Sequence, residues 1–229
     1  MRATTKSGHG LTRRTQSLTY SVNVGGVTPM GVLGRPLGWD QDHEAVRHFN
    51  LGAAYARGDS GLPQDDRQAA HYYKLAADEG HAGAQFVLGL TYAKGSGVLP
   101  QDDREAVRLF KLAADQGFAP AQRALGSYYA NGFGGLPQDD REAVRLFKLA
   151  AEQGDDWAQY SLGLFYAEGL GGLPQDEREA ARLFKLASDQ GLAQAKDRLS
   201  YIEVGLRQEE EEQARQSKAP EGLILRDPE

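Results

Sequence analysis

The sequence predicts an all-α protein, an α/α superhelix of helix–loop–helix repeats. A Leu-Pro-Gln-Asp run recurs at a spacing of 37 residues, beginning at Leu62, Leu99, Leu136 and Leu173. The segments between these runs repeat the same apolar and glycine positions with a helical periodicity. A unit of this length cannot bury its own apolar face, so consecutive units are expected to stack into a solenoid. The spacing predicts repeats 44–80, 81–117, 118–154 and 155–191.

Each repeat should contain two helices, as residues 81–117 illustrate. The first is expected over residues 84–94 and ends at Gly95, because glycine readily adopts the left-handed conformation that closes a helix. After a glycine-rich loop, Asp102 and Glu105 have the spacing of a capping box, which predicts a second helix from residue 104 to about 115. The residues that recur in register, with Tyr73 in place of phenylalanine in the first repeat, are Leu88, Gly89, Tyr92, Ala93, Ala106, Phe110, Leu112 and Ala113. We expect them to form the core, with Gly89 allowing a close helix approach.

The two ends of the chain depart from this pattern. Residues 41–49 resemble the start of a second helix but run directly into a first helix at residues 50–52, which suggests a deletion that fused two repeats. Residues 1–38, rich in Thr, Ser and Gly, are expected to be disordered. Residues 192–205 resemble one more first helix and should cap a solenoid of residues 39–205, followed by a charged extension over 206–229.

Charge, cysteine content and hydropathy argue against several classes of function. The net charge is −6, and residues 1–38 carry five basic and no acidic residues while 206–229 carry four basic and seven acidic ones. This leaves −8 for the repeats, which argues against a nucleic-acid partner. The absence of cysteine excludes a disulfide framework and thiolate chemistry. Without a membrane span or the apolar core of a signal peptide, the chain is expected to be cytoplasmic, with no membrane insertion, or exported if the true start lies elsewhere.

Catalytic and metal-binding motifs are missing from the sequence. The histidines, none of which forms an i,i+4 pair or a His-Glu-x-x-His site, are His9, His43, His48, His71 and His81. Serine acyl-transfer motifs do not occur, and the glycine runs 132–135 and 169–172 lack the lysine of a phosphate loop. We therefore expect no enzymatic activity, no cofactor and no metal.

The first helices point instead to a binding surface. At about 100° per residue, their recurring positions cluster on one side and the positions that change between repeats lie opposite. Few of the changing residues are charged, so we expect a protein or peptide partner to bind them along the concave face. The candidate contacts are Phe86, Leu90, Lys94, Arg123, Ser127, Asn131, Trp157, Tyr160, Leu164 and Glu168. Packing between repeats is the alternative explanation for the apolar ones.

A basic row on the second helices admits two interpretations. Arg104, Arg108 and Lys111 recur in the later repeats, and such a row could bind phosphates. Acidic residues interleave with them, and Lys111 and Asp115 have the spacing of a helical ion pair. We therefore expect a solvated ridge that neutralises its own charge.

The Leu-Gly-x-x-Tyr-x-x-Gly run that begins at Leu88, the Asp-capped second helix and the Ala-Ala-x-x-Gly run that ends at Gly117 resemble the Sel-one-like repeat family, relatives of the tetratricopeptide repeats. The resemblance covers about residues 44–203. It implies a right-handed α-solenoid and, commonly, a non-catalytic adaptor that holds proteins together. Some bacterial relatives are cysteine-rich and described as penicillin-binding or β-lactamase-like, so a β-lactamase-like or cell-wall hydrolase is the alternative function. Those relatives tie each repeat with a disulfide, and this chain has no cysteine.

Overall fold

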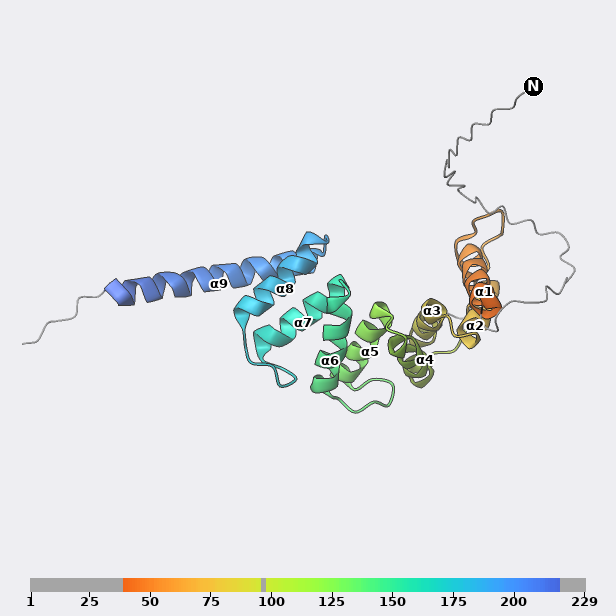
Figure 1. The fold of residues 1–229 in the computed structure, drawn as a ribbon, viewed down its shortest axis with the longest axis horizontal. Coiled ribbons are helices and arrows are strands. Elements are labelled where there is room, and N and C mark those ends of the chain that lie inside the picture. Colours follow the sequence, from red (N-terminus) through yellow and green to blue (C-terminus); the bar gives the residue numbers. More distant parts are fainter. Residues whose placement is uncertain (1–38, 96–97, 219–229) are drawn as a thin grey trace, which may run out of the picture. The chain divides into compact units, whose positions relative to one another are not determined.

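The computed structural model describes residues 39–95 and 98–218, which form α-helices and their connecting loops (Figure 1). The helices in this part of the chain are α1 (Trp39–Arg57), α2 (Asp66–Asp78), α3 (Ala82–Lys94), α4 (Asp103–Asp115), α5 (Ala119–Asn131), α6 (Asp140–Glu152), α7 (Asp156–Glu168), α8 (Glu177–Asp189) and α9 (Ala193–Lys218). The segment 1–38, expected to be disordered, and the last part of the charged extension lie outside the described residues. Within them, none of the helices combines the length and the apolar character that crossing a membrane requires.

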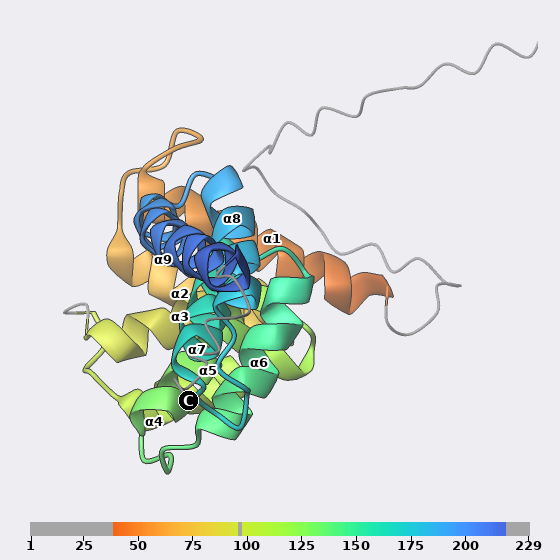
Figure 2. The ribbon, with the colours of Figure 1, turned by 90° about the vertical axis from the view of Figure 1, so that its left-hand side faces the viewer.

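The helices pack mainly on their neighbours in the sequence. Each odd-numbered helix from α1 to α7 pairs with the even-numbered helix that follows it, and that second helix packs in turn on the first helix of the next repeat. The last of these contacts places α9 against α8 (Figure 2). A chain whose repeats contact mainly the adjacent repeats is a solenoid. The predicted all-α repeat fold is thus confirmed.

Aspartate side chains start the second helices, as predicted, but the capping box is only half formed. Asp102 Oδ1 accepts hydrogen bonds from the backbone N–H groups of Arg104 and Glu105, both at 3.0 Å. A full capping box would also have the Glu105 carboxylate accept a hydrogen bond from the Asp102 N–H. This part of the prediction is wrong, because the Asp102 N–H donates to the carbonyl of Tyr92 at 3.0 Å. Glu105 pairs with Arg108 instead. The same backbone bond to a first-helix tyrosine closes the other loops, at Asp65, Asp139 and Asp176.

The two terminal helices are longer than the others. Helix α1 runs without a break through the point where two repeats were expected to be fused, and it begins six residues before the position at which α3, α5 and α7 begin. Helix α9 is continuous across residue 205, so the expected capping helix and the first half of the charged extension form one helix. Tyr201 of α9 is 78% exposed, whereas Leu164, its equivalent in α7, packs on the core.

The core of each repeat depends on an aromatic ring that lies on a glycine. Phe110 is fully buried, and a Cβ atom added to Gly89 would come within 2.7 Å of its Cε1 atom. The expectation that Gly89 permits a close approach is therefore correct, with a ring as the approaching group. The expectation that Leu112 belongs to the core is wrong: Leu112 is 39% exposed, because it lies roughly 200° around α4 from Phe110. Leu109, 2% exposed, is buried instead.

Replacing Gly126 by Leu should destabilise the middle of the solenoid. Even a Cβ atom at this position would lie 2.9 Å from Phe147 Cε1, so the larger side chain must displace the ring at a cost of about 1–3 kcal/mol or more. Thermal unfolding followed by circular dichroism would measure the loss. Gly126→Leu combined with Phe147→Leu should lose less than the sum of the two single changes, because the smaller partner makes room. A melting temperature equal to that of the wild type for Gly126→Leu would contradict the role of the glycine.

Candidate protein-binding surface

The ten candidate residues lie on α3, α5 and α7 at equivalent positions of successive repeats. Residues 37 apart in the sequence are equivalent, so nine of the candidates form three sets, each with one residue from α3, α5 and α7. The first set is Phe86, Arg123 and Tyr160, the second is Leu90, Ser127 and Leu164, and the third is Lys94, Asn131 and Glu168. Trp157, near the beginning of α7, is the tenth candidate. Lys94, Asn131, Trp157 and Glu168 are exposed. The other six are half-buried. The structure thus separates the candidates into an exposed group and a group that also takes part in packing.

The first of these sets contacts the repeat that follows. In α3, the ring of Phe86 lies 5.5 Å from the ring of Phe118, the residue that precedes α5. In α5, Arg123 Nε lies 3.1 Å from a carboxylate oxygen of Asp155, the N-cap residue of α7. Asp155 uses the same carboxylate to accept a hydrogen bond from the Ala158 N–H at 2.7 Å.

The two ends of the array continue this pairing. Phe49 of α1 stacks on His81, the N-cap residue of α3, with ring centroids 4.4 Å apart. Tyr160 of α7 packs on the cluster that contains Leu192, the residue before α9. The chemistry at this position therefore follows the chemistry at the start of the next first helix: aromatic with aromatic, cation with anion, aromatic with leucine. Variation at Phe86, Arg123 and Tyr160 has a structural explanation in these matched junctions.

Residues of the second set also make contacts within the protein. Leu90 and Leu164 lie against the core clusters of their junctions. Ser127 donates its hydroxyl hydrogen to the carbonyl of Arg123 at 3.2 Å, and Asn131 donates from its amide to the carbonyl of Ser127 at 2.7 Å.

The candidates that remain exposed, here called the exposed strip, are Lys94, Asn131 and Glu168 at the carboxyl ends of the three helices, together with Trp157. Trp157 is 41% exposed, and its ring meets that of Tyr160 edge-on at 6.0 Å.

Three buried glutamines, Gln85, Gln122 and Gln159, join successive repeats by hydrogen bonds that the sequence analysis did not predict; together they form a glutamine ladder. Gln85 is 4% exposed, and its Nε2 donates to the Ala77 carbonyl at the end of α2 at 3.2 Å. Its Oε1 accepts from Gln116 Nε2 at the end of α4, at 2.8 Å. Gln122 and Gln159 repeat both bonds. Glutamine at the same helical position of three repeats, beside a buried alanine, was the available signal, because a recurring polar residue on an inward face must be hydrogen-bonded.

The junction between the second and third repeats also contains a tyrosine that links α5 to α4. The Tyr128 hydroxyl donates to Asp103 Oδ1 at 3.2 Å, while its ring meets Phe110 edge-on at 5.5 Å. Burial, with the neighbouring Asp103 charge and hydrogen bond, raises the pKa of Tyr128 to about 12. The hydroxyl therefore remains protonated, and a donor, at neutral pH.

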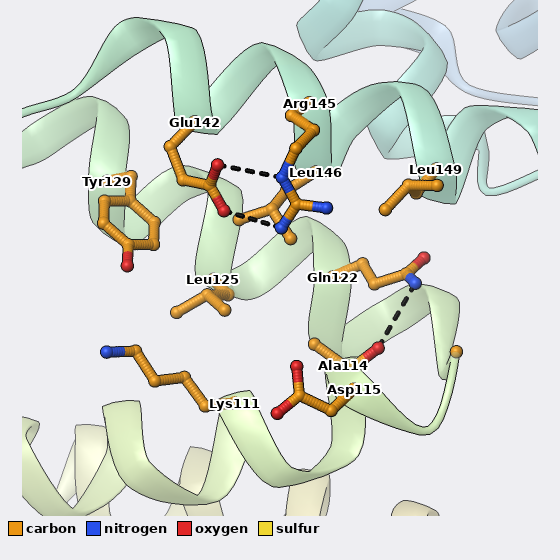
Figure 3. A pocket seen from close by; sticks show the side chains of 11 residues that line it. Lys111, Ala114, Asp115, Gln122, Leu125, Tyr129, Glu142, Arg145, Leu146 and Leu149 are labelled. Carbon is orange, nitrogen blue, oxygen red and sulfur yellow. Dashed lines mark hydrogen bonds and ion pairs between the residues drawn. The ribbon is translucent and has the colours of Figure 1, made fainter.

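A hollow of about 390 Å³ lies between α4, α5 and α6, on the side of the second-helix ridge (Figure 3). Arg145 donates to both carboxylate oxygens of Glu142, at 2.6 and 2.8 Å, and these bonds raise the pKa of the guanidinium. Lys111 lies over the ring of Tyr129, 6.0 Å from its centroid. Equivalent ion pairs join Arg108 to Glu105 and Arg182 to Glu179. The expected self-neutralised ridge is confirmed for these arginines.

These features define an α-solenoid of helix-pair repeats with matched junctions and an exposed strip along its first helices. The sequence model of the Sel1 repeat matches residues 48–81, 82–118, 119–155 and 158–192. The chain therefore belongs to the Sel1 repeat family, the Sel-one-like repeats. Proteins of this family generally act as non-catalytic scaffolds for protein interactions.

Two solved structures from bacteria are similar to this chain. A Sel1 repeat protein from Oxalobacter formigenes superimposes with a TM-score of 0.62 at 32% identity, over 71% of this chain and 65% of that one. The protein c5321, a protective antigen present in uropathogenic Escherichia coli strains and displaying an SLR fold, gives a TM-score of 0.54 at 32% identity, over 72% of this chain and 43% of that one. The chain thus spans less than two thirds of either relative. A search of curated protein sequences finds no match.

The contact between Arg123 and Asp155 should be specific to its junction. Changing Arg123 to Phe leaves the Asp155 carboxylate, 11% exposed, without its cation, whereas Arg123→Phe with Asp155→Phe copies the aromatic junction of Phe86 and Phe118. We expect a coupling free energy of about 0.5–3 kcal/mol between the two sites, with the double variant more stable than additivity predicts. Denaturant unfolding of the four proteins would measure it. Strict additivity would mean that the two residues do not recognise each other.

Proposed function

We propose that this protein is a non-catalytic scaffold that holds a protein or peptide partner along the concave face of its stacked first helices. The partner would contact the exposed strip formed by Lys94, Asn131, Trp157 and Glu168. The half-buried candidates would form the floor beneath it; these are Phe86, Leu90, Arg123, Ser127, Tyr160 and Leu164. No nucleic acid takes part in this proposal, because the repeats carry a net negative charge.

The observation that carries the proposal is the composition of the exposed strip. The same position holds a cation in α3, an amide in α5 and an anion in α7, on helices whose other sides are packed against their neighbours. Stacked repeats present such a position as a row, so an extended partner would meet a different group at each repeat. Near the beginning of α7, on the same side of the helix as Glu168 but about 16 Å from it along the axis, Trp157 offers a large exposed indole. Exposed tryptophan in a binding surface often contributes a large share of the affinity.

Changing Trp157 to Ala should weaken partner capture and leave the fold intact. Truncating an aromatic anchor costs about 2 kcal/mol or more of binding free energy. Because Tyr160 packs 5.5 Å from the buried ring of Phe184, it is left unchanged in this test. A pull-down from the native cell with the wild-type and variant chains, read by mass spectrometry, would identify the proteins lost.

Leu149→Ala supplies the matched control. Leu149 lies on α6 and is 36% exposed, close to the exposure of Trp157, but it belongs to the second-helix side, where it lines the hollow beside Arg145. This variant should retain the partners that Trp157→Ala loses. Loss of the same partners in Leu149→Ala, with retention in Trp157→Ala, would place the binding surface on the second helices and contradict the proposal.

Hydrolysis of a chromogenic β-lactam tests the alternative function directly. Because the sequence lacks serine acyl-transfer motifs and cysteine, the purified chain should hydrolyse nitrocefin no faster than buffer does. Turnover that copurifies with the chain and persists after a second purification step would show that the protein is an enzyme.

A further inference from the structure

The first repeat replaces the glutamine pair of the other repeats with a histidine and a carboxylate. His48 lies at the position of Gln85, and Glu79 at the position of Gln116. Where the glutamines join amide to amide at 2.8–2.9 Å in the later repeats, His48 Nδ1 and Glu79 Oε2 lie 2.9 Å apart. This contact joins α1 to the end of α2, as the glutamine pairs join the two helices of their repeats.

The unusual length of α1 brings a second carboxylate to the same place. In the later repeats, the residue equivalent to Glu44 stands before the first helix, as His81, Phe118 or Asp155. Because α1 begins at Trp39, Glu44 lies inside the helix, one turn before His48. Glu44, His48 and Glu79 each place one ligand atom within 4.8 Å of the other two.

We propose that Glu44, His48 and Glu79 bind a divalent transition-metal ion of the Zn²⁺ type. An imidazole together with carboxylates suits this class of ion, and three protein ligands leave positions for water. Both glutamates are exposed and His48 is half-buried, so the ion can reach the site from solvent. The His48 ring stacks on Tyr72, with centroids 6.1 Å apart, which restricts its orientation.

The ion would connect the two helices of the first repeat at one end of the array. Among the described helices, the first repeat packs on one neighbouring repeat, whereas the inner repeats pack on two, so it shares fewer of the stabilising contacts between repeats. An ion that binds the folded repeat and not the unfolded one stabilises the folded form. This inference is independent of the proposed partner-binding surface, because none of its three residues belongs to the exposed strip.

Calorimetric titration of the full chain with ZnCl₂, in a metal-depleted buffer without phosphate, tests the site. We expect one ion per chain and a rise in melting temperature. The double variant His48→Gln with Glu79→Gln copies the pair of Gln85 and Gln116, so it should keep the fold. The dissociation constant should rise by more than about tenfold, since even the loss of an outer-shell partner has an effect of that size.

Two further variants complete the test. Glu44→Gln leaves the contact between His48 and Glu79 intact and should still weaken Zn²⁺ binding, which separates ligand loss from damage to the fold. His71→Gln removes an exposed histidine of α2 outside the cluster and should leave the dissociation constant unchanged. Absence of Zn²⁺ binding by the wild type, or equal binding by the double variant, would overturn the proposal.

Discussion

Each repeat of this protein depends on one aromatic ring that lies on one glycine. The rings of Phe110, Phe147 and Phe184 pack on the first helix of their own repeat at a glycine, where a Cβ atom would approach within 2.7–2.9 Å. Burying such a ring contributes about 1.5–3 kcal/mol, which offsets the ~1 kcal/mol that a helical glycine costs relative to alanine. Since protein interiors are close-packed, the position of the ring sets the spacing of the two helices. The fully buried alanines beside it, such as Ala106 and Ala113, allow that spacing.

The junctions between repeats combine a constant contact with a variable one. The glutamine ladder uses the same side chain and the same carbonyl position in three repeats, so it can join any two of them. The contact between Phe86 and Phe118, or between Arg123 and Asp155, uses different chemistry at each junction and therefore favours one neighbour over another. On α3, α5 and α7 the exposed residues are Lys94, Asn131, Trp157 and Glu168. In the proposed function, a partner would meet these exposed residues above the half-buried side chains that join the repeats.

The chain departs from its own repeat mainly at the two ends of the array. At the first repeat, His48 and Glu79 replace the glutamine pair, and the longer α1 adds Glu44. At the other end, Lys196 occupies the ladder position and is exposed, and α9 continues as a helix where the inner repeats turn into a loop. Among the described helices, the repeats at the two ends stack on one neighbour and not on two, so polar and charged groups can replace those that stacking requires.

The features that depend on contacts within a few residues were predictable from the sequence. The repeat period, the aspartate caps, the glycine helix ends and the pairing of charges on the second helices all follow from local geometry. The tertiary structure decided which recurring residues are covered: Leu112 recurs yet is exposed, while Gln85 is buried. Two further contacts depend on tertiary packing: the hydrogen bond from the Asp102 N–H to the Tyr92 carbonyl, and the contact of the Phe86 and Phe118 rings between adjacent repeats. A periodic sequence shows which positions are equivalent, but the stacking of neighbouring repeats determines what each position touches.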